Sequence, residues 1–91
     1  MRIRWTQAAA ADLAQIKEYL LEHHPELAQS TVRRLYDSIR SLKLMPHRGR
    51  IGRQEGTREL VGTPLPYVTV YRLKGDSIEI LHLYHGAQDL P

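Results

Sequence analysis

The side chains that could take part in chemistry gather in the second half of the chain. They are Arg48, Arg50, Arg53, Arg58, Arg72, His82, Tyr84, His85 and Gln88. A metal-free ribonuclease needs a general base, a general acid and cations that stabilise a pentacoordinate phosphate, and histidine or tyrosine beside arginines supplies them. Each residue also has an ordinary structural role. Arg72 can lie on the rim of a hairpin, Tyr84 can pack across strands, and His82, in an apolar run, is expected to be buried.

The sequence has no residues suited to metal binding, nucleotide binding or covalent catalysis by a serine or cysteine. The chain has no cysteine and no HExxH motif, and His82 and His85 are three apart on an expected strand, so their side chains would leave opposite faces. We therefore expect no metal and no cofactor. Neither GxxxxGK[ST] nor GxGxxG occurs, and no serine lies in a nucleophile-elbow context.

Length and composition indicate one small globular domain spanning residues 1–91. Of its 91 residues, 42% are hydrophobic, and no apolar run approaches the length needed to span a bilayer. Without disulfides or an apolar leader, the protein is expected to be cytoplasmic, with no membrane partner. A domain this small has room only for a shallow groove, so a protein partner is expected to complete the fold.

The positive charge is concentrated in one segment. Residues 46–58 hold four arginines against Glu55, a balance of +3, whereas residues 59–91 hold two basic and four acidic side chains, a balance of −2. A basic segment can attract nucleic acid or an acidic protein surface. It is equally typical of a solvated, arginine-rich loop.

Two helices are expected in the first half of the chain. Residues 2–5 alternate in polarity as a short strand does, and Thr6 can cap a helix over residues 7–23. Pro25 ends this helix and can begin the next, which Pro46 stops. The second helix carries a heptad stripe made up of Ala28, Val32, Leu35, Ile39 and Leu42. With almost no linker between them, the two helices should form an antiparallel hairpin.

Strands are expected in the second half, after a glycine-containing loop over residues 46–56. The pattern predicts strands at 57–61, 67–73 and 77–84, with a turn at 62–66 and a tight hairpin turn at 74–76. The order is β-α-α-β-β-β. This predicts an α+β fold in which an antiparallel sheet carries the N-terminal helical hairpin on one face.

Three short motifs, in this order, carry a family resemblance. They are Gly56-Thr57-Arg58-Glu59-Leu60, Tyr71-Arg72 and the ending His85-Gly86-Ala87-Gln88-Asp89-Leu90-Pro91. From Arg2 to Pro91 the chain resembles the RelE/ParE superfamily of type II toxin–antitoxin toxins, and within it the ParE branch. The fold that this resemblance implies is the one predicted from the residues.

The resemblance implies one of two activities, because RelE-type members cleave mRNA on the ribosome and ParE-type members inhibit DNA gyrase. Ribonuclease branches usually place an arginine where this chain has Val68. Arg58 matches a family arginine, and His85 falls where some ribonucleases place a catalytic histidine. The ParE-like tail usually has arginine where this chain has Gln88.

We therefore expect a plasmid-stabilisation type of toxin that inhibits gyrase and bacterial growth and is neutralised by a cognate antitoxin. The alternative is a ribosome-dependent, metal-independent mRNA endonuclease that uses Arg58, Arg72 and His85. A third reading is a degenerate paralogue that only binds an antitoxin.

The same interpretation assigns two binding surfaces in a toxin–antitoxin hetero-oligomer. The expected gyrase-binding residues are Arg48, Arg50, Arg53, Arg58, His85 and Gln88. The antitoxin is expected to anchor on Tyr19, Leu27 and Tyr36, since aromatic and apolar anchors dominate interfaces.

Overall fold

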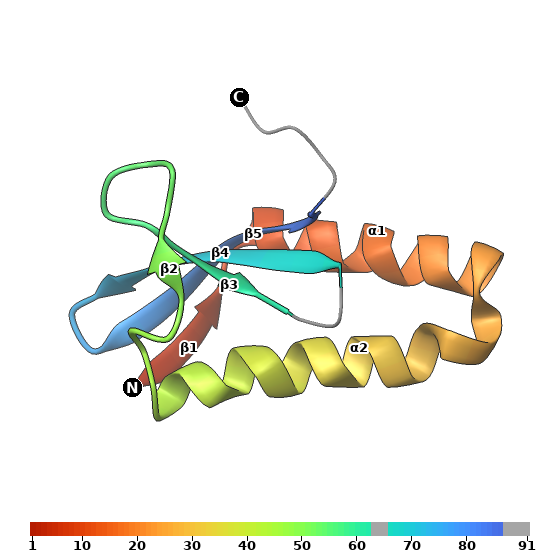
Figure 1. Ribbon diagram of the computed structural model, residues 1–91, viewed down its shortest axis with the longest axis horizontal. Coiled ribbons are helices and arrows are strands. Elements are labelled where there is room, and N and C mark those ends of the chain that lie inside the picture. The colour runs from red at the N-terminus through yellow and green to blue at the C-terminus, as the bar shows by residue number, and fades with distance from the viewer. Residues whose placement is uncertain (63–65, 87–91) are drawn as a thin grey trace.

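Two helices form the hairpin expected from the sequence. In the computed structural model, which describes residues 1–62 and 66–86, α1 spans Gln7–His23 and α2 spans Pro25–Arg40. Thr6 caps α1, because its hydroxyl accepts a hydrogen bond from the Ala9 N–H at 3.2 Å. The two helices run side by side in opposite directions (Figure 1). A 3₁₀ turn, η1 (Ser41–Lys43), extends α2 and carries the buried Leu42.

Among the described residues, the sheet has five strands in the order β1-β5-β4-β3-β2. Their bounds are Arg2–Trp5 for β1, Arg50–Ile51 for β2, Arg58–Val61 for β3, Tyr67–Lys74 for β4 and Ser77–His85 for β5. The predicted α+β class and the β-α-α-β-β-β order are confirmed. The short β2 adds a strand inside the segment that was expected to be a loop.

The sheet is mixed, whereas the sequence pattern indicated a wholly antiparallel one. β2, β3, β4 and β5 pair antiparallel, but β1 pairs with β5 in parallel. The physical reason is the long connection between them. The helical hairpin follows β1, and a parallel pair requires a crossover of this kind.

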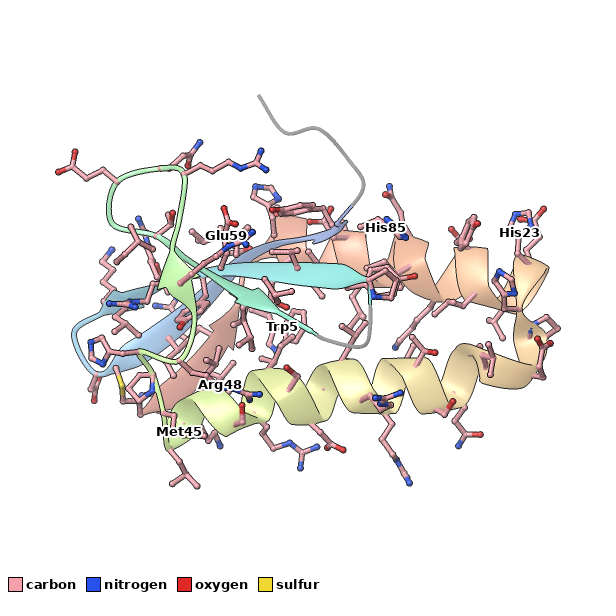
Figure 2. The ribbon with its side chains drawn as sticks, in the orientation of Figure 1. Trp5, His23, Met45, Arg48, Glu59 and His85 are labelled. Carbon is pink, nitrogen blue, oxygen red and sulfur yellow. The ribbon has the colours of Figure 1, made fainter. Side chains whose placement is uncertain are left out.

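One face of the sheet packs against the helices and the other is open. The core joins side chains of both helices to alternate residues of the strands, and its fully buried members include Ala9, Leu42, Tyr71, Ile78 and Ile80. Trp5 packs against this core from β1 (Figure 2). The opposite face of the sheet, which we call the open face, carries charged residues such as Glu59 and Glu79.

Two sequence expectations fall on residues outside the described part. The expected turn at 62–66 includes residues 63–65, and the tail motif includes Gln88, neither of which lies in the ranges 1–62 and 66–86. Within those ranges, no helix combines the length and the apolar character needed to cross a membrane.

Candidate functional site

A bulge in β5 decides which side chains reach the open face. Tyr71 pairs with Ile80 but Val70 pairs with His82, so Leu81 has no counterpart on β4. An extra residue of this kind reverses the alternation of faces beyond it. Before the bulge the even-numbered residues of β5, such as Ile80, face the core. After it Leu83 joins the core, and His82 and Tyr84 turn to the open face.

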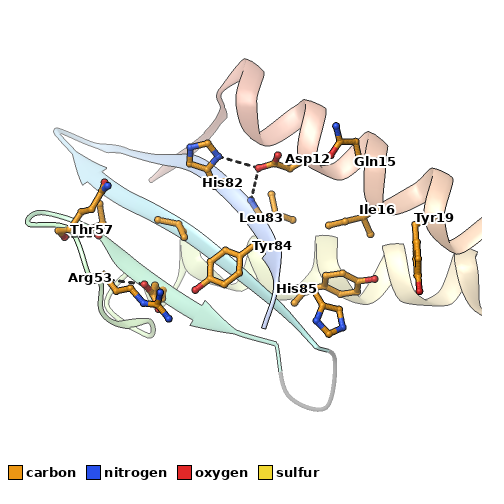
Figure 3. A pocket seen from close by; sticks show the side chains of 14 residues that line it. Asp12, Gln15, Ile16, Tyr19, Arg53, Thr57, His82, Leu83, Tyr84 and His85 are labelled. Carbon is orange, nitrogen blue, oxygen red and sulfur yellow. Dashed lines mark hydrogen bonds and ion pairs between the residues drawn. The ribbon is translucent and has the colours of Figure 1, made fainter. Parts of the chain in front are cut away.

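A hollow of about 800 Å³ lies over the C-terminal half of β5. One wall comes from α1 between Asp12 and Tyr19, and the opposite wall from the loop before β3, including Arg53. His82, Tyr84 and His85 of β5 line it between these walls (Figure 3). The hollow is the one place in the described structure where several of the sequence-predicted chemical residues come together.

His82 and Asp12 lie within hydrogen-bond distance of each other at this hollow. The Nδ1 atom of His82 lies 3.2 Å from Asp12 Oδ2, and the same oxygen accepts a hydrogen bond from the Leu83 N–H at 3.0 Å. The prediction that His82 is buried is wrong: 60% of its side chain is exposed, because the bulge moves it off the core face. Asp12 was missed by sequence reasoning, since no local pattern relates it to a histidine 70 residues away.

Tyr84 lies near two arginines and a buried carboxylate. Arg50 Nη2 is 2.8 Å from Glu59 Oε1, and the Arg53 N–H donates to Glu59 Oε2 at 3.4 Å. The Glu59 side chain is only 4% exposed. Burial by itself would raise the pKa of Glu59, but the hydrogen bonds from Arg50 and Arg53, with the attraction of both charges, outweigh it and lower that pKa. The Glu59 bond, aided by Tyr84 nearby, raises the pKa of Arg50 above its usual value.

Arg58 is directed away from this group and holds the loop before β2. Its Nη1 donates to the carbonyls of Gly49 at 2.8 Å and His47 at 3.3 Å. The buried Tyr71 hydroxyl holds the same loop, donating to the Pro46 carbonyl at 2.7 Å and accepting from the Gly49 N–H at 2.9 Å. Tyr71 and Arg58 together fix residues 46–49.

Arg72 lies elsewhere on the open face. It is paired across β4 and β5 with Glu79, and its Nε lies 2.5 Å from Glu79 Oε1. The imidazole of His85 stacks edge-on against the Tyr67 ring, with 5.7 Å between centroids. Tyr67 is five residues along β4 from Arg72, a separation of roughly 16 Å.

The three residues of the expected nuclease set therefore do not form one site. Arg58 pairs directly with Tyr71, on the face opposite to Arg72. His85 lies at the far end of β5 from both. Of the three, only His85 lines the hollow.

The expected gyrase-binding arginines also spread over several environments. Arg48 donates from Nη1 to Ser41 Oγ at 2.6 Å and lies beside the C-terminal end of α2 (Figure 2). Arg50 is bound to Glu59, and Arg58 to loop carbonyls. Arg53 lines the hollow together with His85.

The three expected antitoxin anchors are exposed, but they occupy different sides of the helical hairpin. Tyr19, 53% exposed, stacks on His23 with 4.4 Å between centroids and reaches the hollow. Tyr36 contacts Trp5 and lies under Lys17 of α1. Lys17 and Tyr19 are roughly 200° apart around the helix, so Tyr36 lies on the side away from the hollow. Leu27 is exposed in the first turn of α2.

No group of three histidine, cysteine or acidic side chains among residues 1–62 and 66–86 could hold a metal ion. The groups present support binding and acid–base chemistry. Asp12 contacts His82, Arg50 brings positive charge close to Tyr84, and Arg53 lines the same hollow as Tyr84.

The sequence and the fold are both similar to those of known proteins. Residues 3–90 match the family model described as the ParE toxin of the type II toxin–antitoxin system parDE. The chain is 39% identical to a Sinorhizobium fredii protein carrying the toxin name Y4kP, over 99% of this chain and 93% of that one. It is 36% identical to the toxin RelE2 of Caulobacter vibrioides, over 96% and 97% of the two chains. A solved chain of the chromosomal ParDE system from P. aeruginosa has a TM-score of 0.86 and 30% identity, covering 93% of this chain and 95% of its own.

Proposed function

Because the chain belongs to the ParE toxin family of type II toxin–antitoxin systems, we propose that it inhibits bacterial growth by binding DNA gyrase and that a cognate antitoxin neutralises it. The observation that carries this proposal is the separation of Arg58, Arg72 and His85. A nuclease must bring its cations and its acid–base groups to one phosphate. Here Arg58 holds a loop and Arg72 holds Glu79.

The proposed gyrase-binding surface is the arginine loop, residues 46–58, with His85 at the end of the hollow. Arg48 and Arg53 are its exposed arginines whose removal leaves the Arg50–Glu59 and Arg58–Gly49 bonds intact. Charged side chains at the rim of an interface guide association and discriminate between partners. Gln88, which lies outside the described residues, remains a predicted gyrase-binding residue.

A supercoiling assay with purified gyrase tests this proposal. The variant combining Arg48→Ala and Arg53→Ala should inhibit about tenfold less well, equivalent to about 1.4 kcal/mol of binding. The control combines Arg33→Ala and Arg34→Ala, which removes the same charge from the exposed surface of α2. Full inhibition by the loop variant would show that the arginine loop is not part of the gyrase-binding surface. A wild-type toxin that leaves supercoiling unchanged would refute gyrase as the target.

The antitoxin is proposed to be a segment that folds on binding and wraps the helical hairpin and a sheet edge. The supporting observation is the exposure of Tyr19, Leu27 and Tyr36 on different sides of the hairpin, because a wrapping segment can reach all of them. A binding partner raises the melting temperature by mass action. Addition of the neighbouring gene's product should therefore raise the Tm and restore growth, and Tyr19→Ala and Tyr36→Ala should each reduce the rise. No shift on mixing would show that this product is not the partner.

One observation favours mRNA cleavage as a second candidate function. Asp12 orients the exposed His82, which gives a potential general base the carboxylate partner that the sequence had not revealed. In that case His82→Gln should lower the rate of RNA cleavage roughly 10²–10⁴-fold. Asp12→Asn keeps an acceptor for the Leu83 N–H but removes the carboxylate that orients His82, so it should lower the rate as well. Intact messages in cells producing the wild-type toxin would exclude this candidate.

A further inference from the structure

Four basic side chains from three strands meet at one end of the open face. Arg2 of β1 and Lys74 of β4 both pair with Ser77, and Arg4 and Arg72 both pair with Glu79. Directly paired residues of neighbouring strands share a face, so the four cations surround the two β5 residues on the open side. We call the set Arg2, Arg4, Arg72 and Lys74 the hairpin patch, since it lies beside the β4–β5 turn.

Glu79, the carboxylate at the centre of the hairpin patch, does not neutralise the positive charge of the patch. Glu79 is 11% exposed and is bonded by Arg72, with Arg4 Nη1 at 3.7 Å. The Arg72 hydrogen bond lowers the pKa of Glu79, against the opposing effect of burial, so this carboxylate stays charged at neutral pH. Even so, the side chains of Arg4 and Arg72 are 64% and 46% exposed.

The other two cations of the hairpin patch are held less closely, although the charge of Lys74 helps to lower the pKa of Glu79. Arg2 and Lys74 are exposed, and within residues 1–62 and 66–86 no side-chain hydrogen bond or ion pair engages either. Four cations set against Glu79 and the turn residue Asp76 leave a surplus of two positive charges. This surplus faces solvent.

The shape and composition of the hairpin patch favour one class of partner. The β1 and β4 cations stand about 10 Å apart across β5, with steps of about 6.6 Å along each strand. Only Ser77 and Glu79 lie between them, so the patch lacks the apolar or aromatic anchor that protein interfaces bury at their centre. Binding to a phosphate backbone needs exposed point charges and no apolar core.

We propose that the hairpin patch binds the phosphodiester backbone of a nucleic acid. This activity goes beyond the binding of gyrase, and it uses a surface apart from the arginine loop. The patch draws on both ends of the chain, and its C-terminal contribution lies in a stretch whose net charge is negative. Segment-by-segment charge counting therefore gives no sign of it.

The test measures binding of the purified full chain to labelled nucleic acid by fluorescence anisotropy over a series of salt concentrations. The probes are a duplex DNA, the same sequence as single-stranded DNA, and the same sequence as RNA. Combining Arg2→Gln and Lys74→Gln should reduce the slope of log K against log salt by about 1.8 for duplex DNA, since each phosphate contact contributes about 0.9. The variant retains both Glu79 ion pairs, so its thermal melting should match that of the wild type.

The control combines Arg33→Gln and Arg34→Gln and should leave the slope unchanged. If the slope of log K against log salt falls equally in both variants, only the net charge matters, and the proposal that the hairpin patch binds nucleic acid is refuted. Tighter binding of an acidic peptide than of every nucleic acid probe would also refute it. Comparison of the three probes shows whether duplex DNA, single-stranded DNA or RNA is bound.

The outcome is separable from that of the gyrase proposal. A toxin that inhibits supercoiling but binds none of the three probes refutes the hairpin patch alone. A toxin that binds DNA through the patch but leaves supercoiling unchanged refutes gyrase inhibition alone.

Discussion

The arginine loop and the hairpin patch are both basic, yet they use their charges differently. In the loop, Arg48 bonds Ser41, Arg50 bonds the buried Glu59, and Arg58 holds loop carbonyls. In the hairpin patch, Arg2 and Lys74 have no such bond within the described residues. Most arginines of the more basic segment are therefore bound to groups within the protein itself. The surplus at the patch arises from strand register, which brings distant residues together.

The largest effect is expected from a substitution that disturbs the packing of the arginine loop. A Cβ atom at position 49 would lie 2.7 Å from the Tyr71 ring and hydroxyl and 3.0 Å from the Glu59 carbonyl. Gly49→Ala should therefore reduce the free energy of unfolding by about 1–3 kcal/mol, as overpacking does. Urea denaturation measures this, with Ser30→Ala on the exposed surface of α2 as the control. Unchanged stability would mean that the loop is not held closely against β3 and β4.

A smaller effect is expected from removing one hydroxyl that anchors the loop. Tyr71→Phe keeps the buried ring but leaves the Pro46 carbonyl and the Gly49 N–H without their partner. The expected loss is about 1–2 kcal/mol in the free energy of unfolding. Hydrogen exchange at Gly49 should rise in the same variant. Loss of stability without faster exchange there would place the cost outside the loop.

Acid should separate the charges that support the fold from those that do not. The pKa of Glu59 is lowered in the folded state, so its stabilising effect is present above its ordinary pKa of 4.5 and is lost as pH falls through the folded value. Glu79 behaves in the same way. Tm should therefore fall below a pH of about 4.5, and Glu59→Gln should flatten this fall.

Arg50→Gln sharpens the same experiment, because only Arg53 then opposes the effect of burial, which raises the pKa of Glu59. Its Tm should be lower than that of the wild type at neutral pH, and its fall below a pH of about 4.5 should be shallower, because protonating Glu59 then removes less stabilisation. An acid profile identical to that of the wild type would show that the Arg50–Glu59 pair does not stabilise the fold.

The smallest effect is expected at the hairpin patch. Arg2→Gln together with Lys74→Gln should change the free energy of unfolding by no more than about 0.5 kcal/mol, the usual range for exposed surface positions. Differential scanning calorimetry of this variant beside Arg50→Gln gives the contrast directly. A clear destabilisation would make the patch a structural feature and remove the difference between the two regions.

The helices and the long strands could be predicted because their signals are local. Leu13 and Leu20 mark one face of α1, Pro25 separates the helices, and Gly75 marks the β4–β5 turn with a φ of 60°. Each of these features acts through neighbours a few residues away.

The site was harder to predict because it depends on register between distant strands. The position of Leu81 opposite a gap in β4 is set by the packing of the whole sheet, and it alone moves His82 off the core face. Asp12 meets His82 only through the way α1 lies beside β5. The same holds for the hairpin patch, whose members are up to 72 positions apart in the chain.

The bulge at Leu81 also has a consequence for how this surface responds to changes in strand length. Deleting Leu81 would make Ile80 and His82 neighbours opposite Tyr71 and Val70, so His82 and Tyr84 would stay on the open face and Leu83 on the core face. Straightening the bulge with Leu81 kept would instead place Leu81 opposite Val70 and move every later residue of β5 to the other face, because the alternation has a period of two. The chemistry of the hollow therefore depends on one residue staying outside the strand pairing, and not only on the identity of the side chains that line it.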